Sequence, residues 1–148
     1  MEVMSRTEPT INLRVAAKAV LVKDNKVLLL REASTYEEGT NLGKWGIPGG
    51  RIESDEPFFD GLRREVDEET GLEIEIDAPI HIGEWWPKIH DVKNHVVALF
   101  VRCAPLTSDI RLSDEHDAFA WVGLDELADY NVMPPDDEVI RKALNKVG

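Results

Sequence analysis

Glutamates with the spacing of metal ligands occur near the middle of the chain, within the segment Arg64-Glu65-Val66-Asp67-Glu68-Glu69. Residues three and four apart are neighbours on an α-helix, so Glu65, Glu68 and Glu69 would share one side of a helix. These like charges repel each other, and solvent, salt or a bound cation must offset the repulsion. Mg²⁺ and Mn²⁺ select carboxylate oxygens. The pattern therefore indicates a divalent-metal site, in which Arg64 can pair with Glu68 or orient a ligand.

The sequence around these glutamates predicts the helix that positions them. Pro57 opens the predicted helix and Gly71 ends it, and both residue types are favoured at those positions. An apolar stripe with helical spacing runs beside the carboxylates. Its residues are Phe59, Leu62 and Val66. We therefore expect the carboxylates to lie at the edge of a packed face, rather than in open solvent.

Strand-like segments precede and follow this helix. The residues 13–22 and 27–30 are apolar, and Asp24-Asn25-Lys26 between them predicts a β-hairpin. A polar loop over 32–44 and a short strand within 45–51 lead to the helix. Further strands are predicted over 72–76, 79–86, 95–103 and 118–122, with short helices over 124–130 and 136–146. This irregular alternation predicts an α/β fold, a mixed sheet in an α/β/α sandwich.

Composition and charge limit the class of protein. The length of 148 residues predicts a single domain over 1–148, with 1–12 as a loose lead-in. The formal net charge of −12 disfavours nucleic-acid polymers and anionic membranes as partners. The longest apolar run, Val96–Val101, is far shorter than the roughly 20 residues that span a bilayer. Because no signal segment is visible and Cys103 is the one cysteine, expected to be buried, we predict a cytoplasmic protein.

The glutamates belong to a longer pattern, Gly-x5-Glu-x7-Arg-Glu-Val-x-Glu-Glu-x-Gly-Leu, over residues 50–72. This pattern resembles the Nudix box of the Nudix, or MutT-like, hydrolase family at every specified position. The segments 45–50 and 121–127 are also similar to that family. The resemblance implies a Nudix fold and a metal-dependent hydrolase that cleaves a nucleoside diphosphate linked to another moiety.

The same resemblance implies roles for individual residues. Glu65, Glu68 and Glu69 are the implied ligands of Mg²⁺ or Mn²⁺, and a backbone carbonyl at Gly49 is a further implied ligand. Arg64 would hold a glutamate in place. A divalent cation at such a site neutralises phosphate oxygens and lowers the pKa of a bound water.

The general base differs among members of this family, between a glutamate of the box and a residue of a later loop. Glu115 falls where such a loop residue would lie, so we predict that it is an additional metal ligand or the base. The adjacent His116 could accept a proton near neutral pH, but a lone loop histidine is expected at the surface.

Substrate contacts are predicted downstream of the box and around it. Trp85, with Trp86, could stack on a nucleobase. Pro87, fifteen residues after Leu72, resembles a feature of ADP-ribose pyrophosphatases in this family. The cationic candidates for phosphate contacts are Lys44, Arg51 and Lys88.

Three hypotheses for the function follow. The first is cleavage of the diphosphate bond of ADP-ribose or a nucleotide sugar. The second is a MutT-like pyrophosphohydrolase of nucleoside triphosphates, which would differ from the first only in its substrate pocket. The third is a non-catalytic Nudix domain that senses a nucleotide, against which the intact box argues. Relatives are often dimers, so a homodimer is an expectation from the resemblance alone.

Overall fold

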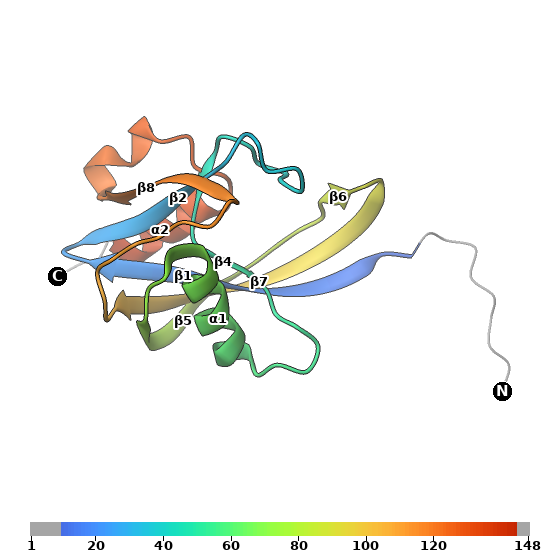
Figure 1. Ribbon diagram of the computed structural model, residues 1–148, viewed down its shortest axis with the longest axis horizontal. Coiled ribbons are helices and arrows are strands. Elements are labelled where there is room, and N and C mark those ends of the chain that lie inside the picture. The colour runs from blue at the N-terminus through green and yellow to red at the C-terminus, as the bar shows by residue number, and fades with distance from the viewer. Residues whose placement is uncertain (1–9, 145–148) are drawn as a thin grey trace, which may run out of the picture.

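The computed structural model describes residues 10–144, and its described strands form one eight-stranded mixed sheet (Figure 1). The path through the sheet is β3-β2-β1-β7-β5, with β4 paired to β1, β6 to β7 and β8 to β2. The strands are β1 (Asn12–Lys23), β2 (Lys26–Glu32), β3 (Trp45–Gly46), β4 (Gly49–Arg51), β5 (Ile74–Trp85), β6 (Lys88–Ile89), β7 (Val92–Pro105) and β8 (His116–Val122). Most of the predicted lead-in, residues 1–9, lies outside the described residues.

The strand directions confirm the predicted mixed sheet. The central strands β1 and β7 pair in parallel, from Asn12 opposite Asn94 to Leu21 opposite Cys103, whereas the other strand pairs are antiparallel. The predicted hairpin joins β1 to β2 through Asp24 and Asn25, which have φ values of 51° and 60°. Two consecutive residues with positive φ are typical of the tight turns that match strand twist.

Helices cover both faces of the sheet, which confirms the predicted α/β/α sandwich. The helix α1 (Phe58–Thr70) packs on one face, where Leu62, Val66 and Cys103 belong to the same buried cluster. On the other face, α2 (Asp136–Leu144) buries Val139 and Ile140 (Figure 1). The predicted helix at 124–130 is a 3₁₀ helix, η1 (Leu124–Asp129), and the predicted end of the last helix at 145–146 lies outside the described residues.

The apolar stripe predicted for α1 is wrong at one residue. Phe59 is 43% exposed, and Phe58 instead packs against the core with Leu62 and Val66. α1 begins at Phe58, after Pro57 as its N-cap in an extended conformation, and Phe58 precedes Leu62 by four residues, which places both on one face of the helix. The helix ends as predicted at Gly71, whose φ of 74° places it in the left-handed region that glycine favours.

The two strands predicted over 72–76 and 79–86 form one strand, β5. Its pairing with β7 shifts register between Ile76 and Ala78 and again between Pro79 and His81. Proline is tolerated here because β5 lies at the end of the sheet path, where a missing N–H breaks no ladder on its outer side. Among residues 10–144, no helix combines the length and apolarity that a membrane span requires.

Candidate active site

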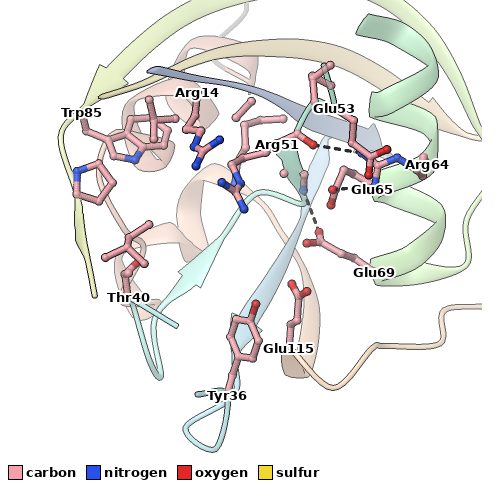
Figure 2. Close-up of a pocket in the computed structure, with 18 of the residues that line it drawn as sticks. Arg14, Tyr36, Thr40, Arg51, Glu53, Arg64, Glu65, Glu69, Trp85 and Glu115 are labelled. Carbon is pink, nitrogen blue, oxygen red and sulfur yellow. Dashed lines mark hydrogen bonds and ion pairs between the residues drawn. The ribbon is translucent and has the colours of Figure 1, made fainter. Parts of the chain in front are cut away.

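A cavity of about 730 Å³ lies between the start of β1, β4, the inner side of α1 and the loop that precedes β8 (Figure 2). Acidic and basic side chains from distant parts of the chain line it together. Its charged lining residues include Arg14, Lys18, Arg51, Glu53, Arg64, Glu65, Glu69 and Glu115. The cavity therefore places the inner face of the Glu-rich helix opposite a cationic part of the sheet.

Two of the three predicted metal ligands face this cavity. Glu69 is only 5% exposed, and its Oε1 accepts a hydrogen bond of 2.9 Å from the backbone N–H of Gly49. Glu65, one turn earlier on α1, lies so close to Gly50 that a Cβ atom there would collide with its carboxylate. The two glycines of β4 therefore let the backbone approach the carboxylates of α1.

Arg64 organises the outer part of this helix face. Its guanidinium donates two hydrogen bonds of 2.8 Å to Glu56, and further ones of 3.1 Å to Glu65 and 3.2 Å to Glu68. The hydrogen bonds from Arg64, with the backbone N–H of Glu53, lower the pKa of Glu56 to about 2. Glu68 itself is exposed and lies outside the residues that line the cavity, so the structure separates it from Glu65 and Glu69.

The carboxylates inside the cavity have unusual protonation properties. Burial raises the pKa of Glu69 to about 8, although nearby Lys18 and the Gly49 N–H act in the opposite direction. Burial is also the main cause that raises the pKa values of Glu65 and Glu115. Acids that are desolvated in one place gain from a hard cation that accepts their oxygens as ligands. This donor set therefore fits the predicted Mg²⁺ or Mn²⁺.

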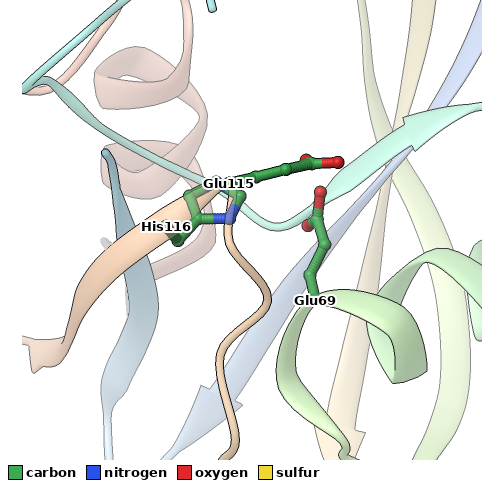
Figure 3. Close-up of side chains that lie close together, drawn as sticks. All are labelled: Glu69, Glu115 and His116. Atoms are coloured by element: carbon green, nitrogen blue, oxygen red, sulfur yellow. The ribbon is translucent and has the colours of Figure 1, made fainter. Parts of the chain in front are cut away.

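Glu115 reaches the same place from the loop before β8, as the sequence analysis predicted (Figure 3). Ligand atoms of Glu69, Glu115 and His116 all lie within 4.8 Å of one another. The prediction that His116 is a surface residue is wrong. Its Nδ1 is shielded from solvent and has no hydrogen-bond partner within residues 10–144, and burial lowers the pKa of His116 to about 4. His116 is therefore a neutral imidazole at neutral pH.

Tyr36 is a lining residue that the sequence analysis missed. It belongs to the loop between β2 and β3, and its ring points into the cavity beside Glu115 (Figure 2). Burial and the carboxylate of Glu115 raise the pKa of its phenol. The only signal for it in the sequence was the length of the polar loop, since a loop of this size in a compact domain is often functional.

The predicted substrate residues are divided between this cavity and a neighbouring one of about 410 Å³. Trp85 and Pro87 line both cavities, and Arg51 lines the first. Trp86 and Lys88 line only the second, where the indole of Trp86 stacks on His95 with 4.7 Å between ring centroids. Lys44 is among the lining residues of neither cavity.

Asp136, at the start of α2, is a second residue that the sequence analysis missed. It is 1% exposed, lines the second cavity and accepts a hydrogen bond of 2.8 Å from the backbone N–H of Ile47. Backbone hydrogen bonds from Trp45 to Asn131 and from Met133 to Trp45, both 2.9 Å, join the same two segments. The chain just before the glycines is therefore attached to the segment that leads into α2.

Comparison with known proteins agrees with this geometry. Residues 12–143 match the family model of the NUDIX domain. A MutT-like protein of Streptomyces ambofaciens is 32% identical over 123 residues, which cover 83% of this chain and 71% of the relative. The CTP pyrophosphohydrolase of Escherichia coli K12 is 25% identical over 118 residues, covering 80% of this chain and 82% of the relative.

The solved structures show the same arrangement. The MutT protein from Methanosarcina mazei Go1 superposes with a TM-score of 0.71 and 27% sequence identity, over 95% of this chain and 96% of that one. The family match extends from the start of β1 almost to the end of α2. The chain belongs to the Nudix hydrolase family.

Proposed function

We propose that this protein hydrolyses a phosphoanhydride bond of a nucleoside triphosphate and releases a nucleoside monophosphate and pyrophosphate. The observation that carries the proposal is the group of desolvated acids around Glu69, whose pKa is raised to about 8. A divalent cation can replace the protons of these acids and bring polyphosphate oxygens to the site. Glu65, Glu69 and the backbone at Gly49 are the proposed ligands of Mg²⁺ or Mn²⁺.

The proposed reaction is a displacement at phosphorus. A water oxygen forms a bond to one phosphorus, the anhydride bond on the opposite side breaks, and the bridging oxygen leaves with the pyrophosphate. When bound, the cation neutralises charge on the phosphate oxygens and acidifies water. Glu115 is the proposed general base because it lies beside Glu69 and its pKa is raised towards the range in which a carboxylate accepts protons effectively. Arg64 keeps Glu65 and Glu68 in place through its hydrogen bonds.

Two observations support triphosphates as the substrate class. The relatives described above include a CTP pyrophosphohydrolase, and a 27% identical relative from Klebsiella pneumoniae is a nucleoside triphosphatase. The cavity also holds Arg14, Lys18 and Arg51, which suit a highly charged ligand.

ADP-ribose or a nucleotide sugar is the second candidate class. It is favoured by Pro87, which lines both cavities beside Trp85. This candidate would use the same proposed metal ligands as the first, and the two substrates differ in the group attached to the diphosphate.

The deciding experiment is turnover with Mg²⁺ or Mn²⁺ across canonical and oxidised nucleoside triphosphates, ADP-ribose, nucleotide sugars and dinucleoside polyphosphates. Pyrophosphate and a monophosphate from a triphosphate are the expected products. AMP and ribose 5-phosphate from ADP-ribose, with inert triphosphates, would establish the second class instead. Saturable nucleotide binding without any turnover would leave only a nucleotide sensor.

The proposal extends to the type of partner, the compartment and the oligomeric state of the protein. The net charge of −12 supports a small-molecule substrate rather than a nucleic-acid polymer, and the single buried cysteine suits the cytoplasm. A homodimer remains an expectation from family resemblance. Light scattering coupled to size-exclusion chromatography measures the mass in solution and decides between monomer and dimer.

A further inference from the structure

The part of the cavity opposite the carboxylates contains two arginines that form no ion pair with any acidic residue of the described part of the chain. Arg14 comes from β1 and Arg51 from β4, and both line the cavity (Figure 2). Among residues 10–144, no ion pair within 4.0 Å includes either of them. The Nε of Arg14 is shielded from solvent, and none of these residues accepts a hydrogen bond from it. We call Arg14 and Arg51 the basic wall.

Strand register fixes where the basic wall lies. Arg14 is opposite Val96 on β7, and Val96 is in turn opposite Trp85 on β5, so these three residues form one row across the sheet. Arg51 is opposite Ala16, which lies two residues after Arg14 and points to the same face of β1. The small side chain of Ala16 leaves open space between the two arginines. Both guanidinium groups therefore lie between the indole of Trp85 and the carboxylates of α1 (Figure 2).

The chemistry of the basic wall calls for an anion. Two guanidinium groups in one cavity repel each other, and a shielded N–H without an acceptor is unfavourable. By contrast, Arg64 on the opposite side has its charge matched by Glu56, Glu65 and Glu68. A phosphate accepts several hydrogen bonds from the planar fork of an arginine and offsets both costs at once.

We propose that Arg14 and Arg51 bind the phosphoryl group on the nucleoside side of the scissile bond. This inference rests on the proposed function. The order of groups in the cavity supports it, since Trp85 offers an aromatic surface to a nucleobase and the metal ligands hold the departing pyrophosphate. A phosphoryl group between those two places is the one that stays with the nucleoside.

Product binding tests the proposal directly. AMP, GMP, CMP and UMP are titrated into the metal-free protein with EDTA present, because the basic wall needs no cation to bind a phosphate. Ribose 5-phosphate and inorganic phosphate serve as smaller probes. We expect Arg14→Gln and Arg51→Gln to weaken monophosphate binding by about 10-fold or more, the usual effect of losing a hydrogen bond to a charged group. In Mg²⁺, product inhibition by pyrophosphate should change by less than about two-fold.

Matched variants distinguish phosphate binding by the basic wall from a general loss of positive charge and from a loss of folding. Arg111→Gln removes the same charge beside Gly71, away from the cavity, and should leave both monophosphate binding and pyrophosphate inhibition unchanged. Arg14→Lys keeps the charge but loses the planar fork, so an intermediate loss is expected. Arg51 is exposed, so its substitution tests the basic wall even if Arg14→Gln is unstable.

Three outcomes would overturn the proposal. Loss of pyrophosphate inhibition with unchanged monophosphate binding would place the departing group at the basic wall. Absence of monophosphate binding to the wild-type protein, or equal binding by wild type and both glutamine variants, would show that the basic wall binds no such group. If instead the wild type hydrolyses no nucleotide but binds monophosphates through Arg14, the proposed function fails and the phosphate site stands.

Discussion

The two sides of the cavity differ in how they are stabilised within the protein. On the acidic wall, formed by Glu65, Glu69 and Glu115, neighbouring groups already hold the carboxylates, since Gly49 donates to Glu69 and Arg64 donates to Glu65. On the basic wall, Arg14 has no such partner among the described residues. The acidic wall is thus assembled before any ligand arrives, whereas the basic wall depends on an anion for its hydrogen bonds.

Hydrogen bonds on the acidic wall do not offset the cost of burying its carboxylates. Even with its hydrogen bond from Gly49, Glu69 has a pKa raised to about 8 by burial. Metal-free Glu69 therefore holds a proton near neutral pH, and a divalent cation would compete with that proton.

Removing the charge at the centre of the acidic wall should have the largest effect. We expect Glu69→Gln to lower kcat by at least about 10²-fold, because a carboxylate in contact with the cation is lost while the shape of the side chain remains. Steady-state turnover on the substrate identified above measures this. Glu73→Gln, an exposed glutamate just after α1, is the matched control. Equal turnover by Glu69→Gln and wild type would exclude Glu69 from the metal site.

Stability should depend on pH in the direction set by Glu69. Its ordinary pKa is 4.5 and its folded pKa is about 8, so the unfolded chain loses this proton first as pH rises. The contribution to the free energy of unfolding is fully present below pH 4.5 and is lost as pH rises through 8, on the order of 2–4 kcal/mol. Urea unfolding of metal-free protein at several pH values measures this. The loss should shrink in Glu69→Gln or with Mg²⁺, and a loss of the same size in that variant would contradict the assignment.

The support behind the acidic wall should matter less than the wall itself. Glu56→Gln removes the charge that receives two hydrogen bonds from Arg64. Because Arg64 then holds Glu65 less firmly, we expect the Mg²⁺ concentration for half-maximal activity to rise by about 10-fold, as for other residues that orient metal ligands. A Mg²⁺ titration of activity measures this, with Asp60→Asn in the first turn of α1 as control. An unchanged Mg²⁺ requirement would assign Glu56 to folding alone.

A lysine outside both walls should have the smallest effect. Lys44 was predicted to contact phosphate, but it lines neither cavity. Lys44→Ala should therefore change kcat/KM by less than about two-fold, the usual range for a surface substitution. Comparison with Arg51→Gln in the same assay places this effect on a common scale. A loss as large as that of Arg51→Gln would show that the loop between β2 and β3 moves to bring Lys44 to the substrate.

The acidic wall was largely predictable because its α1 residues are close in sequence. Glu65 and Glu69 are one helical turn apart, so helical geometry alone groups them, and the Nudix box pattern covers them. Glu115 required the family resemblance. Arg14 and Tyr36 were missed because strand register and loop conformation, rather than a local spacing, bring them to the cavity.

The fold was predictable to a similar degree and for similar reasons. Apolar periodicity located the hairpin, the main helix and the layers. It failed where an edge strand tolerates Pro79 and where Phe58, rather than Phe59, packs against the core. His116 was taken for a surface residue because burial of a single polar side chain leaves no pattern in the sequence. Tertiary packing decides each of these features.

The hydrogen bond between Asp136 and Ile47 couples the position of α2 to the glycine turn before α1. Ile47 lies only two residues before Gly49, whose N–H orients Glu69. A partner protein or an affinity tag that displaces α2 would loosen that glycine turn, and the carboxylate of Glu69 would lose its alignment without being touched. A fusion on the C-terminal side of this enzyme therefore risks lowering its activity, although α2 is far from Glu69 along the sequence.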